Sequence, residues 1–265
     1  MIANVLTIAG TDPTGGAGIQ ADIKTFSALG AYAMSAITAV VAQNTCGVRS
    51  FVALEPHFVA DQIDAVFEDV RVDAVKIGMV ATAQIASAIA DRLRHHDARN
   101  IVLDPVMVAK SGDHLLRPDA VEAIRSELVP LTTVLTPNLP EAGVLLDANL
   151  DWTPEVMRRR IADLHKLGSQ WVLLKGGHLR GDEESMDLLL GEGETIELRA
   201  PRIATTNDHG TGCTLSAAIA AVLSQHTVEE SVRRAKSYVH RSLAASGQLK
   251  VGKGHGPLHH FHALW

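Results

Sequence analysis

A glycine-rich turn that runs into a helical pattern is the segment of this chain best suited to chemistry. The turn reads His209-Gly-Thr-Gly-Cys213, and the apolar residues after it keep the spacing of a helix with one buried face, at Leu215, Ala218, Ile219, Val222 and Leu223. The helix is predicted to start near Gly212. Because the first turn of a helix has unpartnered backbone N–H groups and the positive end of the helix dipole, this segment is expected to bind phosphate.

Cys213 lies where these N–H groups converge. A helix N-terminus lowers the pKa of a thiol, so Cys213 is expected to supply a thiolate as base or nucleophile. The alternative is a glycine-rich loop followed by a small core cysteine, since free cysteines are usually buried. A separate phosphate-binding loop elsewhere in the chain would favour that alternative.

Another glycine-rich loop, residues 10–18, follows the first predicted strand. Its Gly16-x-Gly18-x-x-Ala21 fits a loose dinucleotide-binding pattern, but that pattern needs an acidic residue about 20 positions further on. No Asp or Glu occurs between Asp22 and Glu55. A Rossmann oxidoreductase is therefore disfavoured, and the Gly-Lys-Ser/Thr of a Walker A loop is absent from the sequence as well.

Polar residues follow several predicted strands, at Asp104, Asn138, Glu141 and Lys175. In open α/β sheets, ligands bind at the carboxyl ends of the strands, so these side chains are expected to meet. A few carboxylates and a lysine suit Mg²⁺ and nucleotide phosphates. Taken singly, each residue has a structural alternative: Asp104 precedes a proline as turn residues do, and Glu141 fits the first turn of a short helix.

Short apolar runs alternate with helical patterns along the chain. Strands are expected at 5–9, 74–78, 100–104, 134–138 and 171–175, with helices around 19–29, 59–70, 83–95 and 154–167. This alternation predicts an α/β fold with a mostly parallel sheet and helices on both faces. Residues 186–203 predict an antiparallel edge hairpin that turns through Gly191-Glu-Gly193, and the absence of a linker favours a single domain, 1–265.

Composition excludes several classes of protein. With 265 residues, 46% of them hydrophobic and 20% charged, the chain can build a large core. A net charge of −6 disfavours nucleic-acid binding, and the run Arg158-Arg159-Arg160 is interpreted as a solvated helix face. Cys46 and Cys213 cannot form a disulfide framework, and neither a signal peptide nor the roughly 18 to 20 apolar residues of a membrane helix are found, which predicts a cytoplasmic protein.

Histidines gather near the C-terminus, at His255, His259, His260 and His262, and His95 and His96 form a second pair. They lack cysteine or carboxylate partners at metal-ligand spacing, so packed or solvated side chains are expected rather than a metal site. Phe261 and Trp265 are expected to dock the tail on the body of the protein.

Several motifs in one order resemble the hydroxymethylpyrimidine/phosphomethylpyrimidine kinase family of thiamine biosynthesis, over nearly the whole chain. They are the 10–22 loop, Val41-Ala-Gln43-Asn-Thr45, Lys76-Ile-Gly-Met79, Asp104-Pro-Val-Met, Thr136-Pro-Asn-Leu-Pro-Glu141, Lys175-Gly-Gly-His178, His209-Gly-Thr-Gly-Cys213 and the tail from Gly252. The resemblance implies a ribokinase-like three-layer α/β/α sandwich. It also implies transfer of phosphate from MgATP to 4-amino-5-hydroxymethyl-2-methylpyrimidine and then to its monophosphate.

The resemblance also assigns the pyrimidine site. It places the ring near Gly10, Asp22, Gln43, Met79 and Val106. From the residues alone, Asp22 would be a surface residue. Gln43 offers both a donor and an acceptor, which suits an aminopyrimidine edge, but a strand end capped by water is an equal alternative.

For the transfer itself, the resemblance implies that backbone groups of Gly210, Thr211 and Gly212 stabilise the moving charge. Cys213 stands where related sugar kinases carry an aspartate base. The resemblance assigns ATP to Lys175 and Asn138, assigns the Mg²⁺ to Asp104 and Glu141, and implies a homodimer. The chain departs from the family pattern at Asp208, where a threonine is expected, and at Cys46 beside the Gln-Asn-Thr element. The negative charge of Asp208 could weaken nucleotide binding.

Three alternatives stay open. A pyridoxal kinase of the same fold would share the glycine-rich turn 209–213, called here the anion loop, together with the Asn138-x-x-Glu141 element and Cys213. A non-catalytic nucleotide-binding regulator would share the scaffold, since fold alone does not prove activity. A Rossmann oxidoreductase is the weakest. The sequence also leaves open whether the loop 106–118, with Lys110-Ser-Gly112, closes over the site.

Overall fold

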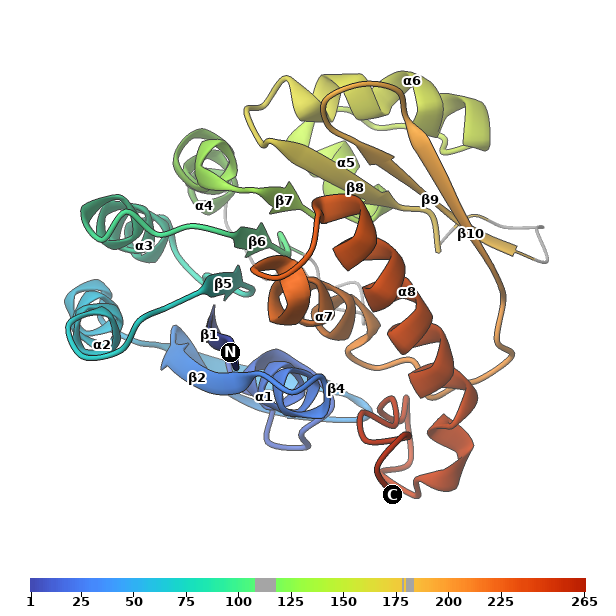
Figure 1. Ribbon diagram of the computed structural model, residues 1–265, viewed down its shortest axis with the longest axis horizontal. Coiled ribbons are helices and arrows are strands. Elements are labelled where there is room, and N and C mark those ends of the chain that lie inside the picture. The colour runs from blue at the N-terminus through green and yellow to red at the C-terminus, as the bar shows by residue number, and fades with distance from the viewer. Residues whose placement is uncertain (108–117, 178, 180–183) are drawn as a thin grey trace.

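A computed structural model describes residues 1–107, 118–177, 179 and 184–265. Within these residues, the central layer is an eight-stranded sheet of order β10-β9-β8-β7-β6-β5-β1-β2 (Figure 1). Its strands are β1 (Asn4–Ala9), β2 (Tyr32–Ile37), β5 (Ala74–Ile77), β6 (Ile101–Leu103), β7 (Val134–Leu135), β8 (Trp171–Lys175), β9 (Glu184–Leu190) and β10 (Ile196–Pro201). Neighbours from β2 to β8 pair in parallel, whereas β8, β9 and β10 pair antiparallel, so the predicted sheet and its edge hairpin are confirmed.

Helices cover both faces of this sheet (Figure 1). One face carries α2 (Pro56–Phe67), α3 (Ala83–His95), α4 (Pro118–Ala123), α5 (Leu139–Leu145) and α6 (Pro154–His165), and the other carries α1 (Gly18–Ala28), α7 (Thr211–Leu223) and α8 (Val228–Ala244). Short turns of other helix types lie at Ile124–Leu128, Val129–Leu131 and Ser246–Gln248. The three-layer α/β/α sandwich expected from the resemblance is confirmed.

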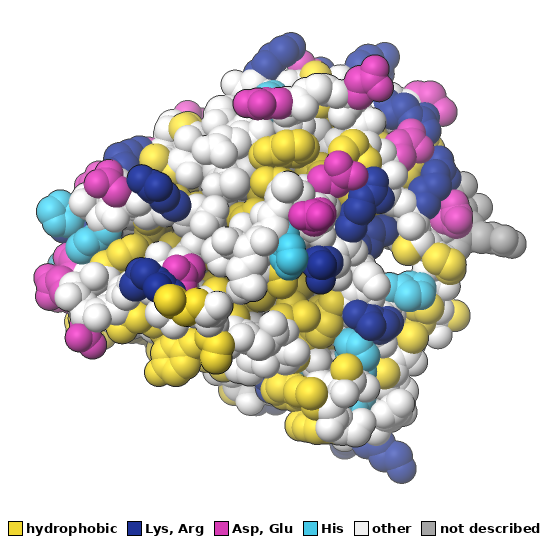
Figure 2. Space-filling model, in the orientation of Figure 1, with side chains coloured by type: hydrophobic (Ala, Val, Ile, Leu, Met, Phe, Trp, Pro, Cys, Tyr) yellow, Lys and Arg dark blue, Asp and Glu magenta, His cyan; other side chains and the backbone are white. Residues whose placement is uncertain are grey.

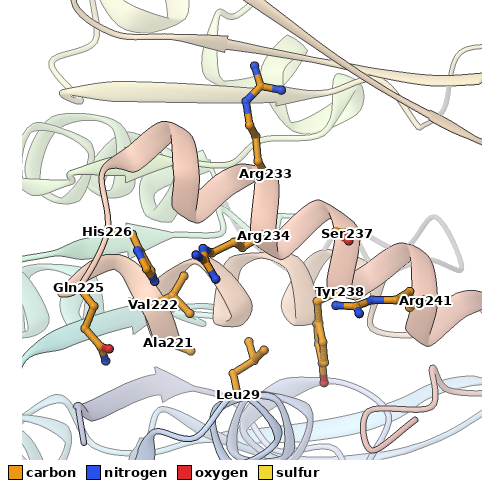
Figure 3. A pocket seen from close by; sticks show the side chains of 10 residues that line it. All are labelled: Leu29, Ala221, Val222, Gln225, His226, Arg233, Arg234, Ser237, Tyr238 and Arg241. Carbon is orange, nitrogen blue, oxygen red and sulfur yellow. The ribbon is translucent and has the colours of Figure 1, made fainter. Parts of the chain in front are cut away.

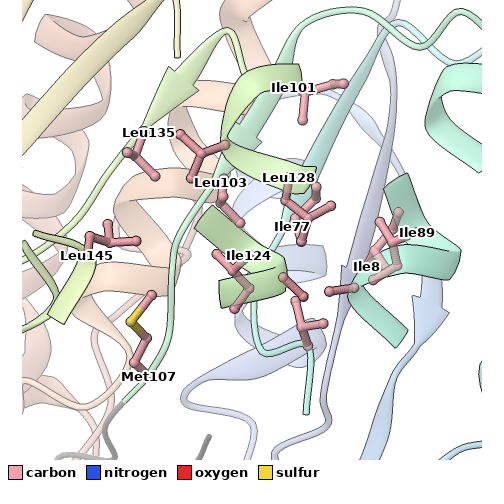
Figure 4. Packing of buried hydrophobic residues seen from close by; sticks show 14 of the residues in the cluster. Ile8, Ile77, Ile89, Ile101, Leu103, Met107, Ile124, Leu128, Leu135 and Leu145 are labelled. Carbon is pink, nitrogen blue, oxygen red and sulfur yellow. The ribbon is translucent and has the colours of Figure 1, made fainter. Parts of the chain in front are cut away.

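The strands divide their apolar side chains between two cores because successive residues of a strand point to opposite faces. Leu103 of β6 and Leu135 of β7 pack on the α3 side, where Figure 4 shows them beside Leu145 of α5. Their neighbours Val102 and Val134 pack on the α7 side. All the described strands of the main sheet share these two cores, which supports the proposal that the chain is a single domain.

A second, two-stranded sheet lies beside the first. It pairs β3 (Ala39–Asn44) with β4 (Gly47–Ala53) in antiparallel fashion, with an irregular register between Ala42 and Gln43. The sequence patterns predict neither this sheet nor β2. Most of β4 is exposed, so its apolar residues do not show the alternation by which a half-buried strand is recognised.

The C-terminal tail docks through different residues from those expected. Leu258, His259 and His260 are buried, and Tyr238 donates its hydroxyl hydrogen bond to the carbonyl of His260. Trp265 is 78% exposed and its ring packs on Phe261 and on the buried His259 of the tail itself, so its predicted docking role is wrong. Phe261 is half-buried. The packed state expected for this histidine cluster is confirmed for its two buried members.

Over the described ranges, no helix is both long and apolar enough to cross a membrane. The same part of the chain holds no group of three or more His, Cys, Asp or Glu side chains placed to bind a metal.

Candidate active site

The anion loop enters α7 through Gly210. This residue is the N-cap and has φ of 77°, a left-handed conformation that favours glycine, and a Cβ on it would overlap the carbonyl oxygen of Gly16. The two glycine-rich loops therefore touch backbone to backbone. Among the described residues, the N–H groups of Gly212 and Cys213 have no acceptor, as expected for a first helical turn.

Charged side chains from β6 and β8 lie at this helix terminus. The Nζ of Lys175 lies 2.8 Å from Oδ1 of Asp104, which is 2% exposed. A Cβ on Gly212 would lie 3.2 Å from that Nζ and 3.6 Å from Oδ2 of Asp104. The structure thus brings together Asp104, Lys175 and Gly212, which the sequence predicts from separate strand ends and loops. Because Gly212 has no side chain, none lies between it and the two charged groups.

Asn138 and Glu141 form a capping box at the start of α5. The side-chain oxygen of Asn138 accepts from the N–H of Glu141 at 2.8 Å, and Oε2 of Glu141 accepts from the N–H of Asn138 at 2.8 Å. Glu141 therefore lies in the first turn of a short helix, as the structural alternative predicted. In the part of the chain described, its Oε1 accepts no hydrogen bond. Burial raises the pKa of Glu141 to about 7, with Asp104 adding to the effect and Lys175 opposing it.

Asp22 is fully buried, so the surface position that its sequence pattern suggests is wrong. Its Oδ2 accepts from Lys76 Nζ at 2.8 Å and from the hydroxyl of Thr7 at 2.6 Å, while its buried Oδ1 has no hydrogen-bond partner among the residues that the structure describes. Burial alone would lower the pKa of Lys76, but the carboxylates of Asp22 and Asp104 and the sulfur of Cys213 raise it above its usual value.

Sequence reasoning missed the role of Lys76. The available signal was a lysine inside the apolar strand Ala74-Val-Lys-Ile77, because a charge in a buried parallel strand needs an opposite charge. The charge of Lys76 also favours the thiolate form of Cys213. The ion pair between Lys76 and Asp22 therefore lies next to the anion loop.

The predicted lowering of the Cys213 pKa is wrong. The residue is only partly exposed, and burial raises the pKa of its thiol to about 11. Lys76 and an N–H of Gly18 favour the thiolate, whereas the carboxylates of Asp104 and Asp22 disfavour it. Desolvation and two nearby negative charges outweigh the lysine and the N–H of Gly18.

The residues assigned to the pyrimidine are only partly brought together. A Cβ on Gly10 would lie 3.2 Å from the sulfur of Met79 and 3.6 Å from a methyl of Val41. Gln43 is half-buried near the end of β3, and Val106 is half-buried after β6. None of the described contacts joins Gln43 or Val106 to Met79. The predicted lid lies largely outside the described residues, which omit 108–117.

A basic groove of about 480 Å³ lies at the opposite end of α7 (Figure 3). It is lined by Leu29, Val222, His226, Arg234 and Arg241, among others. Leu29 and Ser224 are the C-caps of α1 and α7, so this end carries the negative poles of two helix dipoles. The groove is therefore no counterpart of the anion loop.

An α/β sandwich in which a glycine-capped helix terminus meets a lysine and carboxylates at the strand ends is typical of phosphate-transferring enzymes, and its fold is that of the ribokinase-like class. Residues 12–259 match the phosphomethylpyrimidine kinase family model. The chain therefore belongs to this family and is a kinase.

Named relatives agree with this assignment. The hydroxymethylpyrimidine/phosphomethylpyrimidine kinase of Salmonella typhimurium is 56% identical over 99% of this chain and 98% of its own length. Among solved structures, the phosphomethylpyrimidine kinase of Clostridium difficile is 41% identical with a TM-score of 0.81, covering 91% of this chain and 99% of that one. The pyridoxal kinase of Bacillus subtilis, solved as an ADP complex, is 33% identical with a TM-score of 0.90 and covers 99% of both chains.

Proposed function

We propose that this protein uses ATP to phosphorylate 4-amino-5-hydroxymethyl-2-methylpyrimidine, and then the resulting monophosphate to the diphosphate. The observation that supports this most is the first turn of α7. The N–H groups of Gly212 and Cys213 have no acceptor among the described residues there, and Gly212 lies beside Lys175 and Asp104. Such preorganised donors stabilise charge on a transferring phosphoryl group.

In the proposed reaction, the hydroxymethyl oxygen attacks the γ-phosphorus of ATP in line. Gly210 and Gly212 orient backbone N–H groups toward the γ-phosphate, and Lys175 neutralises phosphate charge from the β8 side. The role expected for the N–H of Thr211 does not hold, because that group donates to the carbonyl of Asp208 at 3.4 Å. Asn138 fixes the start of α5 next to the nucleotide, through its capping box and its bridge to Lys175. Cys213 takes the hydroxyl proton as a thiolate, so its thiol must first release its own proton to solvent before the oxygen attacks.

The carboxylates of Asp104 and Glu141 fit a Mg²⁺ ion. Mg²⁺ favours one or two carboxylates together with waters and phosphate oxygens, and each of these side chains keeps an oxygen without a hydrogen bond among the described residues. When bound, the ion would neutralise charge on the ATP phosphates.

The proposed pyrimidine site is formed by Gly10, Met79 and Gln43, with Asp22 and Val106 nearby. A Cβ on Gly10 would lie only 3.2 Å from the sulfur of Met79, so glycine at this position keeps the backbone free of a side chain beside that sulfur. The buried Oδ1 of Asp22 lacks a donor in the described structure and would accept a hydrogen bond from the substrate.

Pyridoxal phosphorylation is the second candidate function. The pyridoxal kinase of Staphylococcus aureus, solved with AMP-PCP and pyridoxal, is 32% identical with a TM-score of 0.90 over the whole of this chain. The fold therefore accommodates either ring, and the choice depends on the ring-facing residues.

Product analysis by mass spectrometry distinguishes these functions. With the pyrimidine alcohol and MgATP, we expect the monophosphate first and then the diphosphate, at a kcat/KM at least tenfold above that for pyridoxal. A faster reaction with pyridoxal would support the second function. No ADP release with either alcohol would support a non-catalytic nucleotide-binding protein.

We further propose that the protein is a cytoplasmic homodimer. Large apolar side chains are exposed on and beside the small sheet, at Tyr32, Val40, Phe51, Val52 and Phe58. Figure 2 shows hydrophobic side chains gathered over β2 on the face it presents. Exposed apolar side chains of this size are common at protein interfaces, and the two unpaired cysteines are compatible with a reducing compartment.

Sedimentation analysis tests the dimer. Val52 is 68% exposed, and we expect Val52→Asp to shift the protein to monomer because a charge would be buried at the interface. Val251→Asp, at an exposed apolar residue of the tail, should leave the mass unchanged. Equal masses for the wild type and Val52→Asp would contradict this interface.

A further inference from the structure

The C-terminal tail is hydrogen-bonded to the turn between β3 and β4 through a single residue, Thr45. The hydroxyl oxygen of Thr45 accepts from the N–H groups of Lys253 and Gly254, at 3.2 and 3.1 Å. Its carbonyl accepts from the N–H of His255 at 2.9 Å. Thr45 is 6% exposed, so water cannot readily replace these contacts. Figure 1 shows the tail beside the β3–β4 hairpin.

The same tail segment contacts the anion loop on its other side. The N–H of His209 donates to the carbonyl of Gly256 at 3.0 Å, and His209 forms a β-bridge with Pro257. The Nδ1 of His255 lies 2.8 Å from Oδ1 of Asp208. The tail therefore lies between two segments that the proposed function assigns to the two substrates.

Glycines in the tail allow it to pass between the β3–β4 turn and the segment that precedes the anion loop. A Cβ on Gly252 or Gly254 would overlap atoms of Thr45, and a Cβ on Gly256 would overlap the side chain of Asn207. By contrast, a Cβ on Gly247 would meet nothing within 4 Å. The alternating glycines of Gly252-Lys-Gly-His-Gly256 are thus explained by close approach on both sides.

His209 extends the connection to the first glycine-rich loop. Its Nε2 lies 2.8 Å from Oδ2 of Asp12, which is fully buried. The Asp12 carboxylate also accepts from the N–H groups of Thr14, Gly16 and Ala17, at 2.9, 3.1 and 2.8 Å. Asp12 therefore holds the 10–18 loop, and through His209 it fixes that loop to the anion loop.

We propose that residues 252–257 form a positioning strap that couples the binding of the pyrimidine ring to the binding of the ATP phosphates. Gln43 lies two residues before Thr45, and His209 directly precedes the anion-binding glycine Gly210. Thr45 and His209 are positioning residues, because they hold these segments without touching the reacting atoms. The inference rests on the proposed function, which supplies the two ligands.

The strap has a measurable consequence. If it fixes the β3–β4 turn against the anion loop, a ligand that orders one segment lowers the cost of ordering the other. In the wild type, we expect AMP-PCP to tighten binding of the pyrimidine alcohol by about fivefold or more, the lower end of typical coupling between sites. Thermodynamic reciprocity requires the pyrimidine alcohol to tighten AMP-PCP by the same factor.

The test compares Thr45→Val with Thr45→Ser by titration calorimetry, each with and without the second ligand. Valine removes the hydroxyl that accepts two backbone N–H groups, whereas serine keeps it. We expect the coupling factor to fall to within twofold of one in Thr45→Val, with KM for the pyrimidine alcohol raised several-fold. Thr45→Ser should keep the wild-type coupling.

A second pair of variants guards against a loss of folding. Gly254→Ala should reduce the coupling and Gly247→Ala should not, and the thermal midpoint of each variant shows whether it is folded. Folded Thr45→Val and Gly254→Ala with wild-type coupling and KM would overturn the strap. A wild type that phosphorylates no pyrimidine would instead overturn the proposed function, and a wild type that phosphorylates it without any coupling would overturn the strap alone.

Discussion

Replacing Cys213 by alanine is expected to lower kcat by about 10²- to 10⁴-fold, the usual contribution of a general base. The side chain lies in the first turn of α7, beside Lys76 and the two carboxylates of Asp22 and Asp104. KM for ATP should change little, because the phosphates are bound by backbone N–H groups that the substitution leaves in place. Steady-state kinetics with the pyrimidine alcohol checks both values.

The pH dependence provides the sharper test of this role. Because the pKa of the Cys213 thiol is raised to about 11, the group is protonated at neutral pH and its thiolate fraction grows about tenfold per pH unit below that value. Catalysis by the thiolate predicts that kcat/KM rises with pH between 7 and 9 in the wild type. The rise should be absent in Cys213→Ala.

Two further variants separate a base from a packing role. Cys46 is exposed, and no described hydrogen bond or ion pair joins it to Lys76, Asp22 or Asp104. Cys46→Ala should therefore behave as the wild type. Serine is a much weaker acid than cysteine, and Cys213→Ser should therefore lose activity as alanine does. Wild-type turnover by Cys213→Ser would show that the residue only fills space.

The second large effect is expected on stability, from Lys76→Met. The substitution leaves the Asp22 carboxylate fully buried and without its cation. Removing one partner of a buried ion pair typically costs about 3–5 kcal/mol in the free energy of unfolding, a large part of the stability of a domain. Urea denaturation followed by circular dichroism measures the change.

Matched variants identify the cause of this loss. The double variant Lys76→Met with Asp22→Asn removes both charges and should recover most of the loss, giving a coupling energy of about 2 kcal/mol or more. Lys166 forms an exposed pair with Asp163, and Lys166→Met should cost less than about 1 kcal/mol. Equal losses for Lys76→Met and Lys166→Met would contradict the buried pair.

Much of the fold can be predicted because its signals are local. The parallel strands are continuous apolar runs, and helices such as α3 repeat their apolar residues with helical spacing. The β3–β4 sheet escapes prediction because the apolar residues of β3 do not alternate with polar ones and most of β4 is exposed. Its turn is hydrogen-bonded to the tail, at a sequence separation of 209 for Thr45 and Gly254.

The site shows the same division between local and distant causes. Strand ends and the glycine turn predict Asp104, Lys175 and the anion loop, because carboxyl ends of parallel strands meet at one edge. The raised pKa values of the Asp22 carboxyl and of the Cys213 thiol depend on burial and on charges contributed by separate elements. These effects are sums over neighbours that no single segment of sequence contains.

The central claim is that the first turn of α7 receives the phosphoryl group in flight. It is tested most directly by a crystal structure of the protein with MgADP, the pyrimidine alcohol and a trigonal-planar metal fluoride that mimics this group. We predict the fluoride within hydrogen-bond distance of the N–H groups of Gly212 and Cys213, in line with the hydroxymethyl oxygen. A fluoride bound elsewhere, with this helix terminus blocked by side chains, would contradict the account.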